Sequence, residues 1–360
     1  MKVLLISPHP PPYGGIANWT AMLLDYSKNT DDVFSTINIA PKKRSTEGRN
    51  IFDRVVVSGL DMLKKNRELK VQIKKNRPDV IHMTTSGSLA IIRDILLLKT
   101  ARKHGIPTVY HIRFGKTEKM AQSNSKLWRL YSKAMKIADA VLAIDKNTYF
   151  AVKNYVPDAN VILVPNPINT AKLPKLEYEP KKQVVFLGWV VPTKGVSELV
   201  EAWNTVGSEY PDYNLLIIGQ SSPAYLEELK SNIKADNIIF AGEMPHEKAM
   251  EAVMESEVFI LPSYTEGFPN AVVEAMALKK PVIASAVGAI PEMLANDCGI
   301  LINPKSSEEI ISALRKLLSD KELRERIATN ALNKVDSEYK IETVYKQYKE
   351  IWNKVKENVK

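Results

Sequence analysis

One strand–loop–helix unit decides the fold class, and residues 258–276 read VFILPSYTEGFPNAVVEAM. Val258–Leu261 form a short apolar run, which is typical of a strand buried on both faces of a parallel sheet. The loop that follows carries Glu266 and Gly267, and a helical pattern starts near Asn270. We therefore predict a strand, a polar loop and a helix N-terminus whose free amides and dipole favour phosphate groups.

Short β-branched runs alternate with amphipathic helical patterns along the whole chain, and this rhythm restarts after residue 180. Such alternation predicts α/β architecture, with parallel sheets covered by helices on both faces. The predicted strands are Lys2–Ser7, Val33–Ile39, Val55–Val57, Asp79–Met83, Thr108–Ile112, Ala140–Ile144, Asn160–Val164, Gln183–Leu187, Tyr213–Ile218, Asn237–Ala241, Val258–Leu261, Pro281–Ala284 and Gly299–Ile302.

A proline-rich joint divides the chain. Three prolines between residues 165 and 174 mark a linker. We therefore predict a doubly wound domain over residues 1–165, a linker over 166–182 and a second doubly wound domain over 183–336. Sheets of this kind bind ligands beyond the carboxyl ends of their strands, so we expect a cleft where the domains meet. A helical pattern with an apolar stripe fills residues 337–360, and we expect it to pack back toward the N-terminal domain.

Composition excludes several classes of protein. The 360 residues are 45% hydrophobic and 25% charged, which excludes disordered, collagen-like and coiled-coil chains. The single cysteine, Cys298, excludes a disulfide framework and a cysteine-based structural zinc site. No run approaches 18 uncharged apolar residues, and the first residues do not resemble a signal peptide. We expect a cytoplasmic protein.

The positive charge is concentrated in the first half of the chain. Residues 1–165 carry 27 Lys and Arg against 13 Asp and Glu, a balance of +14, whereas residues 166–360 carry 23 against 28, a balance of −5. A basic half of this kind favours an anionic partner. The first basic segment holds Lys64, Lys65, Arg67, Lys70, Lys74, Lys75 and Arg77, and the second holds Lys116, Lys119, Lys126, Arg129, Lys133 and Lys136 around Leu127, Trp128, Leu130 and Tyr131.

The second basic segment combines apolar, aromatic and cationic residues, as helices at membrane interfaces do. We therefore expect an anionic membrane surface as a partner, with a solvated helix face over an ordinary core stripe as the alternative. Neither segment carries an aromatic platform or a recognisable nucleic-acid-binding motif, so nucleic acid is not an expected partner.

Two further loops follow predicted strands and lead into helices. Gly14 and Gly15 lie after the first strand, and paired glycines let a phosphate or a sugar approach the backbone closely. Lys194 follows the first strand of the second domain, where its charge suits a diphosphate. Neither loop matches the dinucleotide-binding fingerprint or the P-loop. The alternatives are an ordinary turn at the glycines and a solvated charge at Lys194.

Polar side chains also lie at a strand end and on the decisive loop and helix. His111 closes a strand, where it is able to hydrogen-bond a substrate hydroxyl or move a proton, with a structural role as the alternative. Glu266 is placed to accept hydrogen bonds from ligand hydroxyls. Glu274, about one turn into the helix, is placed to bind a vicinal diol such as a ribose, or else only complements the helix dipole. The adjacent strand ends in His82, Thr84, Thr85 and Ser86.

Together these motifs resemble glycosyltransferase family 4, a group of retaining, sugar-nucleotide-dependent enzymes with the GT-B fold. The resemblance covers nearly the whole chain and rests on order and spacing. Its elements are the Gly14-Gly15 loop, His111 after a mid-domain strand, the Pro165-Asn166 joint, the Lys194-Gly195 turn and the spacing from Glu266 to Glu274. It implies two Rossmann-like domains that face a central cleft.

The resemblance implies roles for the matching residues. Glu274 would hold the ribose, and Glu266 the donor sugar. Lys194 would bind the diphosphate and stabilise charge on the departing nucleotide. His111 would lie near the reacting sugar, so His111, Lys194 and Glu266 form the expected catalytic group. The other donor-binding residues are Gly14, Gly15, Arg113, Gly267, Phe268, Pro269 and Asn270.

The chain departs from the family at one position, because Trp189 stands where an arginine is common. Lys194 with the helix dipole, or Arg113, would then supply the missing positive charge. No D-x-D motif occurs, so we expect no metal and no other cofactor. The resemblance implies front-face attack, with the departing phosphate oxygen taking the acceptor's proton, and therefore no enzymic nucleophile.

The reaction that this implies is transfer of a sugar from a nucleotide-sugar, a UDP-sugar or a related donor, to a lipid-linked or glycan acceptor in bacterial surface-polysaccharide synthesis. The protein would act peripherally at the inner face of the plasma membrane. Two alternatives stay open: a sugar-nucleotide 2-epimerase of the same fold, and an inactive scaffold that binds nucleotide-sugars without turnover.

Overall fold

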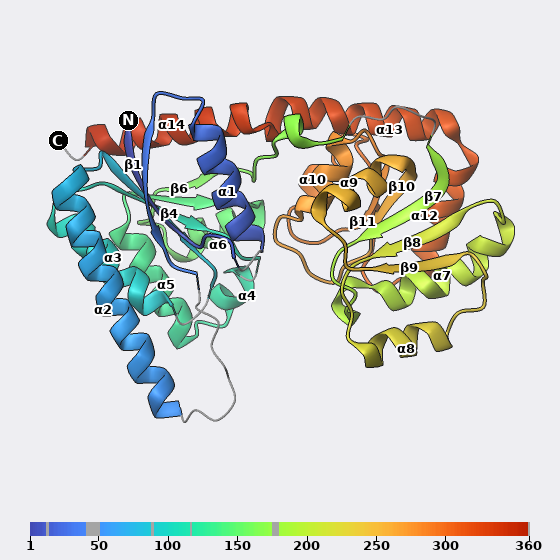
Figure 1. Cartoon of the computed structure of the whole chain (residues 1–360), viewed down its shortest axis with the longest axis horizontal. Helices are drawn as coiled ribbons and strands as arrows, with labels where there is room; N and C mark the ends of the chain where they lie inside the picture. The colour runs from blue at the N-terminus through green and yellow to red at the C-terminus, as the bar shows by residue number, and fades with distance from the viewer. Residues whose placement is uncertain (12–13, 41–50, 88–89, 116, 175–179, 359–360) are drawn as a thin grey trace. The chain divides into compact units, whose positions relative to one another are not determined.

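A computed structural model describes the chain except for residues 12–13, 41–50, 88–89, 116, 175–179 and 359–360, and over 51–58 it describes the backbone only. The chain divides into two compact units (Figure 1). Unit 1 consists of Met1–Pro167 with Val344–Lys360, and unit 2 consists of Ile168–Thr343.

Unit 1 is built on a parallel sheet with the strand order β2-β1-β3-β4-β5-β6. Its strands are β1 (Lys2–Ser7), β2 (Val33–Asn38), β3 (Val80–Thr85), β4 (Thr108–Ile112), β5 (Ala140–Ala143) and β6 (Val161–Leu163). Its helices are α1 (Gly15–Ser27), α2 (Ile51–Asn76), α3 (Ile91–Lys103), α4 (Thr117–Gln122), α5 (Lys126–Ile137) and α6 (Lys146–Tyr155), and most of α14 (Ile341–Asn358) also belongs to it.

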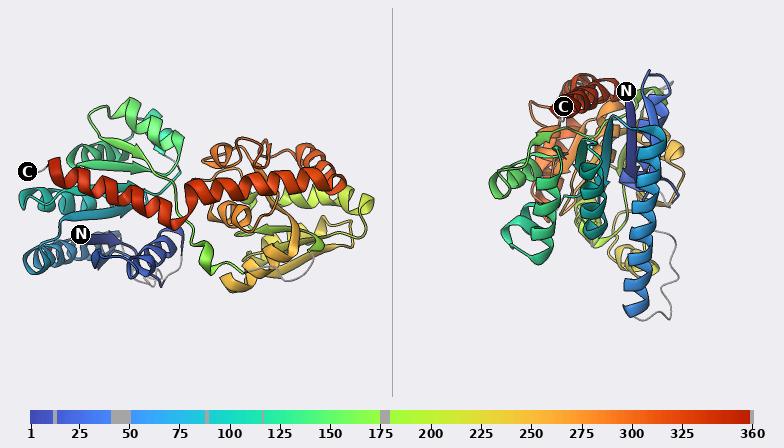
Figure 2. Two further views of the ribbon diagram at one scale, coloured as in Figure 1. Left: turned by 90° about the horizontal axis from the view of Figure 1, so that it is seen from above. Right: turned by 90° about the vertical axis from the view of Figure 1, so that its left-hand side faces the viewer.

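Helices cover both faces of this sheet. Since successive side chains of a strand point to opposite sides, alternate residues of one strand belong to different cores. Leu4 and Ile6 of β1 pack with residues of α2, α3, α5 and α6. Val3 and Leu5 pack on the opposite face with α1 and the apolar stripe of α14. The view from above in Figure 2 shows α14 running across this sheet. The C-terminal helix therefore completes the hydrophobic core of unit 1.

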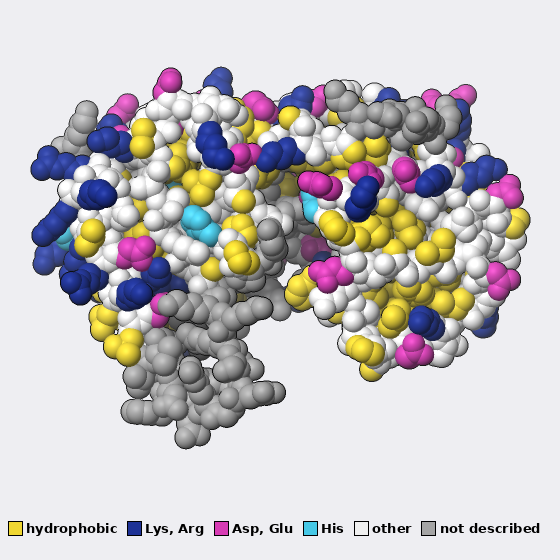
Figure 3. Space-filling view, viewed as in Figure 1, with side chains coloured by type: hydrophobic (Ala, Val, Ile, Leu, Met, Phe, Trp, Pro, Cys, Tyr) yellow, Lys and Arg dark blue, Asp and Glu magenta, His cyan; other side chains and the backbone are white. Residues whose placement is uncertain are grey.

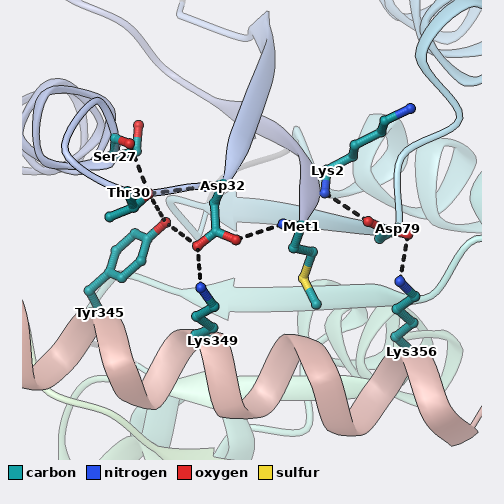
Figure 4. A network of polar contacts seen from close by, with 9 residues as sticks. All are labelled: Met1, Lys2, Ser27, Thr30, Asp32, Asp79, Tyr345, Lys349 and Lys356. Atoms are coloured by element: carbon teal, nitrogen blue, oxygen red, sulfur yellow. Dashed lines mark hydrogen bonds and ion pairs between the residues drawn. The ribbon is translucent and has the colours of Figure 1, made fainter.

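Polar contacts fix α14 to the amino-terminal edge of the sheet (Figure 4). The Asp32 carboxylate accepts hydrogen bonds from the Met1 ammonium at 2.8 Å and the Tyr345 hydroxyl at 2.9 Å, and it pairs with Lys349 at 3.2 Å. Lys356 pairs with Asp79 at 2.7 Å. Burial alone would raise the pKa of Asp32, but these hydrogen bonds and the nearby positive charges outweigh burial and lower it.

Unit 2 repeats the architecture with the strand order β12-β11-β10-β7-β8-β9, again all parallel. Its strands are β7 (Lys181–Leu187), β8 (Asn214–Ile218), β9 (Ile238–Gly242), β10 (Ser256–Leu261), β11 (Val282–Ser285) and β12 (Ile300–Ile302). Its helices are α7 (Val196–Glu209), α8 (Pro223–Ser231), α9 (His246–Glu255), α10 (Asn270–Ala277), α11 (Ile290–Met293), α12 (Ser307–Ser319) and α13 (Lys321–Lys334). The apolar residues of its strands and helices form one continuous hydrophobic core around this sheet.

One predicted strand is wrong, and one predicted helix starts later than expected. The predicted strand Val55–Val57 lies inside helix α2, because the helix preferences of ordinary residues differ by less than about 0.7 kcal/mol and three valines do not interrupt a long helical segment. The predicted helix over 337–360 begins only at Ile341, after a π-helical turn over Val335–Tyr339. Lys340 is extended there and pairs with Ile168, whose carbonyl accepts from the Ile341 amide at 2.9 Å.

The aromatic part of the second basic segment is also not available to a membrane. Trp128 is 4% exposed and Tyr131 is 1% exposed, because their spacing on α5 places them with Ala134 against the sheet. The cations of this segment that the structure describes remain at the surface, and Lys116 lies outside the described residues. Within the described part of the chain, no helix is both long enough and apolar enough to span a bilayer.

Candidate functional site

The predicted residues of unit 2 gather at the carboxyl edge of its sheet. Lys194 ends a short turn after β7, and Glu266 lies on the loop after the neighbouring strand β10. The Lys194 Nζ atom lies 2.5 Å from Glu266 Oε1, and these side chains are only 25% and 11% exposed. A cation and a carboxylate therefore lie side by side, both partly withdrawn from water.

Two glycines hold the loops around this ion pair close together. Gly195 has φ +69°, and a Cβ atom there would lie 2.1 Å from the Pro262 carbonyl oxygen. Gly288 has φ +58°, and its Cβ would lie 2.4 Å from the Glu266 oxygen and 2.5 Å from that of Gly267. Only glycine fits both the backbone conformation and the space at these positions. The backbone at Glu266 and Gly267 therefore approaches position 288 more closely than a side chain there would allow.

Helix α10 starts directly after this loop. Asn270 is its first residue, and the preceding Pro269 supplies no side-chain cap, so no side chain of the N-cap satisfies the first amides. The Gly267 carbonyl accepts from the Ala289 amide at 2.8 Å, and the Phe268 ring meets Tyr339 edge to face at 5.7 Å. The positive end of the helix dipole thus lies beside Lys194 and Glu266, in an arrangement suited to an anion.

Glu274 lies one turn into α10 and has a partner that sequence reasoning missed. His246 Nε2 lies 2.9 Å from Glu274 Oε1, and this hydrogen bond raises the pKa of His246. The Glu274 side chain is 17% exposed, whereas that of His246 is 62% exposed. The position of His246 in the chain could have predicted this contact. His246 is the first residue of the helix after β9, and it therefore lies at the same edge of the sheet as Glu274.

Trp189 lies on the loop after β7, where the family often has arginine. Its side chain is 72% exposed, while the Val190 amide next to it donates to the Gln220 carbonyl at 2.8 Å. The tryptophan ring therefore does not fill the core of unit 2.

In unit 1, His111 lies on β4 and is completely buried. Its Nδ1 atom lies 3.1 Å from His82 Nε2, and the Trp352 indole donates to His82 Nδ1 at 3.1 Å. Burial, together with the Arg113 charge, lowers the pKa of both histidines, that of His82 to about 3. Both are neutral at physiological pH.

Arg113 follows β4 and is 9% exposed. Its guanidinium lies 4.4 Å above the Trp19 ring, and its Nη1 atom is 3.5 Å from His111 Nε2. Burial lowers the pKa of Arg113 to about 10, while the hydroxyl of Tyr348 opposes this shift. No carboxylate of the described residues pairs with this guanidinium, and its Nε atom has no hydrogen-bond partner among them. A buried cation of this kind favours an anionic ligand.

Gly14 and Gly15 lie at the N-terminus of α1. Gly14 is the N-cap and is extended, and a Cβ at either position would meet no described atom within 4 Å. Neither the backbone conformation nor packing against the described residues therefore requires glycine here.

The structure thus groups the predicted residues by unit. Gly14, Gly15, His111 and Arg113 belong to unit 1, and Lys194, Glu266, Gly267, Phe268, Pro269, Asn270 and Glu274 belong to unit 2. Across the residues with described positions, no three His, Cys, Asp or Glu side chains are arranged to hold a metal ion.

Comparison with known proteins agrees with this architecture. Residues 39–172 match the family described as Glycosyltransferase Family 4, and residues 168–334 match that described as Glycosyl transferases group 1. The structure resembles the sucrose-phosphate synthase of Thermosynechococcus elongatus, with a TM-score of 0.79, 19% identity and 98% of each chain covered. It also resembles Anabaena HepE in complex with UDP, with a TM-score of 0.75, 16% identity and coverage of 98% and 100%. The predicted GT-B fold class is confirmed.

Among curated proteins, the chain is 26% identical over 176 residues to the capsular polysaccharide biosynthesis glycosyltransferase CapM of Staphylococcus aureus, covering 47% of the chain and 45% of CapM. It is 28% identical over 159 residues to TuaC of Bacillus subtilis, a putative teichuronic acid biosynthesis glycosyltransferase, covering 44% and 39%. The chain spans about half the length of these curated relatives. The two family matches together extend from residue 39 to residue 334, and the chain belongs to glycosyltransferase family 4.

Proposed function

We propose that the protein is a retaining glycosyltransferase that moves a sugar from a nucleotide-sugar, a UDP-sugar, to a lipid-linked or glycan acceptor in cell-surface polysaccharide synthesis. The observation that carries the proposal is the Lys194–Glu266 pair beside the N-terminus of α10. A nucleotide-sugar offers each of these groups a partner, because it combines a diphosphate with sugar hydroxyls.

Donor binding would separate Lys194 from Glu266 and give each side chain a new partner on the donor. The diphosphate would take Lys194 and the amides of Gly267 to Asn270, and the sugar hydroxyls would donate to Glu266. Glu274 would accept from the ribose hydroxyls. The free-energy cost of separating Lys194 from Glu266 would be offset, because each side chain gains a donor group of suitable polarity at the same edge of the sheet.

The reaction would break the bond between the anomeric carbon and the phosphate oxygen, and the acceptor oxygen would form its bond on the same face. The acceptor's proton would pass to the departing phosphate oxygen, so no protein nucleophile takes part. Negative charge grows on that oxygen, and Lys194 with the α10 dipole would stabilise it. In unit 1, the proposal assigns contacts with the reacting sugar and phosphate to His111 and Arg113, and close approach of a phosphate to Gly14 and Gly15.

The donor and acceptor classes rest on the relatives. HepE, which has the same fold, binds UDP in its solved structure, which supports a uridine nucleotide. CapM and TuaC are named for capsular polysaccharide and teichuronic acid synthesis, which supports a glycan or lipid-linked acceptor. The base would be read by residues 242–244, at the carboxyl end of β9 and directly after it.

Helix α2 supports the membrane part of the proposal. Its exposed apolar residues are Leu60, Leu63 and Val71. Its exposed cations are Lys64, Arg67, Lys70, Lys74 and Lys75, and the exposed Arg77 directly follows the helix. Figure 3 shows Lys and Arg side chains gathered over the unit that carries this helix. Apolar and basic residues on one helix suit the surface of an anionic membrane, and we propose peripheral binding at its cytoplasmic face.

Thermal-shift titration with UDP, GDP, ADP and TDP, each with and without EDTA, tests the donor site. We expect one base to raise the melting temperature without metal, and the Glu274→Ala variant to lose that response. Glu255→Ala is the matched control, since Glu255 pairs with Lys181 at 2.5 Å at the opposite edge of the sheet. A response that survives in Glu274→Ala contradicts the assignment.

Incubation of the stabilising nucleotide's sugars with membrane extract then separates the alternatives. A transferase releases the nucleoside diphosphate only when acceptor is present. An epimerised donor without acceptor would indicate a 2-epimerase, and binding with no product would indicate an inactive scaffold.

A further inference from the structure

A chain of buried polar side chains crosses unit 1 from its C-terminal helix to the end of β4. It runs from Trp352 through His82 to His111 and ends at Arg113. The two histidines and Trp352 are fully buried, and the rings of Trp19 and Tyr348 pack around both imidazoles at centroid distances of 5.3–5.9 Å. The imidazoles therefore have little freedom to turn.

The indole N–H of Trp352 starts this chain of hydrogen bonds, and it determines which atom donates in each of them. An indole N–H only donates, so His82 Nδ1, 3.1 Å from Trp352 Nε1, must carry a lone pair. A neutral His82 then has its proton on Nε2 and donates it to His111 Nδ1 at 3.1 Å. His111 Nδ1 is consequently an acceptor, and the proton of a neutral His111 is on Nε2.

This direction leaves two donors face to face. His111 Nε2–H points toward Arg113 Nη1, which is 3.5 Å away, and a guanidinium has no acceptor atom. The contact between them is therefore not a hydrogen bond. An oxygen about 2.9 Å from each nitrogen would accept from both.

We propose that Trp352 and His82 hold His111 as an Nε2–H donor, so that His111 and Arg113 together bind one anionic phosphoryl oxygen. Trp352 and His82 are positioning residues, whereas His111 and Arg113 touch the ligand. The phosphoryl oxygen belongs either to the donor's diphosphate or to the phosphate of a lipid-linked acceptor. The proposal rests on the proposed function only for this choice of ligand, since the tautomer follows from contacts within unit 1.

Arg113 supports the choice of an anion. Its guanidinium is nine-tenths buried, pairs with no described carboxylate and keeps one Nε–H without a partner. Its described neighbours are the neutral histidines, the Tyr348 hydroxyl and the face of Trp19. A buried cation among neutral groups gains more from an anionic oxygen than from a neutral one.

Imidazole ¹⁵N spectroscopy of the wild-type protein tests the tautomers without any substitution. The chain has five histidines, so single His→Gln variants are sufficient to assign the signals. We expect both His82 and His111 to show a protonated Nε2 and a bare Nδ1 at pH 7. A bare Nε2 or a doubly protonated ring at His111 would overturn the proposal.

The Trp352→Phe variant removes the first donor and keeps an aromatic ring. We expect His82 and His111 to become mixtures of tautomers while the variant still folds. Tyr345→Phe is the matched control, because it removes a buried hydrogen bond of the same helix without touching the histidines. Unchanged tautomers in Trp352→Phe, or equal mixing in Tyr345→Phe, would contradict the positioning role.

Titration of the labelled protein with UDP, and separately with dodecyl phosphate, tests the ligand. A shift of the His111 Nε2 signal with UDP assigns the pair to the donor, and a shift with dodecyl phosphate alone assigns it to an acceptor phosphate. In either case we expect Arg113→Gln to abolish the shift. No shift with either probe overturns the anion site. If UDP still stabilises the protein through Glu274, the proposed function survives that result.

Discussion

Lys194 and Glu266 are the residues on which the proposed chemistry depends most. Among the described residues, each is the other's only ion-pair partner, and both side chains are partly buried. A ligand that replaces this contact must bring a negative group to Lys194 and hydrogen-bond donors to Glu266. A nucleotide-sugar meets both requirements.

Removal of either side chain therefore reduces transfer. For Lys194→Ala we expect kcat/KM for the donor to fall by at least about 100-fold, because charge on the leaving oxygen loses a preorganised cation. Glu266→Ala is expected to act similarly through the donor sugar. Rates of nucleotide release from the donor check both variants. Lys182→Ala, which removes an exposed lysine of β7 that pairs with Asp212 at 3.1 Å, is the control. Normal turnover in both site variants would show that the site is wrongly placed.

The glycine at position 288 supports the loop that carries Glu266. For Gly288→Ala we expect loss of about 1–3 kcal/mol in the free energy of unfolding and weaker donor binding, since the new Cβ meets the Glu266 and Gly267 carbonyls. Gly242→Ala separates strain from collision, because Gly242 also has a positive φ, +71°, but open space around it. Urea unfolding monitors both. Equal losses would mean that the close approach of the loop does not matter.

Single residues were predictable where the signal was local. Glu266 and Glu274 stand out because a strand, a loop and a helix N-terminus follow one another within twenty residues. His246 was missed because its partner Glu274 is 28 residues away and is reached only through the order of the strands. The contact of His82 with Trp352 spans 270 residues, and no local pattern announces it.

Among the elements, α14 has the most consequence for unit 1. It contributes an apolar stripe to the core and, through Lys349 and Tyr345, two polar contacts to Asp32. These contacts lower the pKa of Asp32 below its ordinary value of 3.8 despite burial. A carboxylate of this kind stabilises the folded state fully above the unfolded pKa, and the stabilisation is lost as the pH falls through the folded pKa.

We therefore expect the free energy of unfolding of the wild type to decline below about pH 4, and Asp32→Asn to make this decline shallower. Urea titrations between pH 2 and pH 7 measure it. Asp158→Asn, which removes a carboxylate from an exposed pair with Lys136, is the control. An unchanged slope in Asp32→Asn would show that the network around Asp32 does not couple α14 to the sheet.

Helix and strand boundaries were predicted correctly where the local sequence determines them and incorrectly where a contact with a distant residue does. Lys2–Ser7 and Thr108–Ile112 agree with β1 and β4, because apolar runs rich in β-branched residues define them. The break at Lys340 was not predictable, since it results from pairing with Ile168 far away in the sequence. The position of Trp128 shows a further limit: helical spacing predicts that a stripe is buried, but composition alone suggested a membrane.

At the scale of the whole molecule, the uneven distribution of charge along the chain indicates an anionic partner. The excess of 14 positive charges over residues 1–165 includes the exposed cations of α2. Each is worth about 1 kcal/mol near an anionic membrane, which is about fivefold in affinity. Replacement of Lys64, Arg67, Lys70 and Lys74 by Gln should thus lower binding to vesicles containing anionic lipid by at least 100-fold.

Vesicle sedimentation at several salt concentrations checks this, since screening weakens the attraction. The control replaces four exposed lysines of unit 2, Lys230, Lys248, Lys316 and Lys321, by Gln. Equal loss in both variants, or binding that salt does not affect, would contradict a specific basic face on α2.

Hydrogen exchange of the full chain with and without UDP tests the central claim, that the carboxyl edge of the unit 2 sheet holds a nucleotide. The account predicts slower exchange over residues 193–195 and 263–274, which carry Lys194, Glu266 and Glu274, and loss of this protection in Lys194→Ala. UDP that protects other segments of unit 2 while leaving these two unchanged would contradict it.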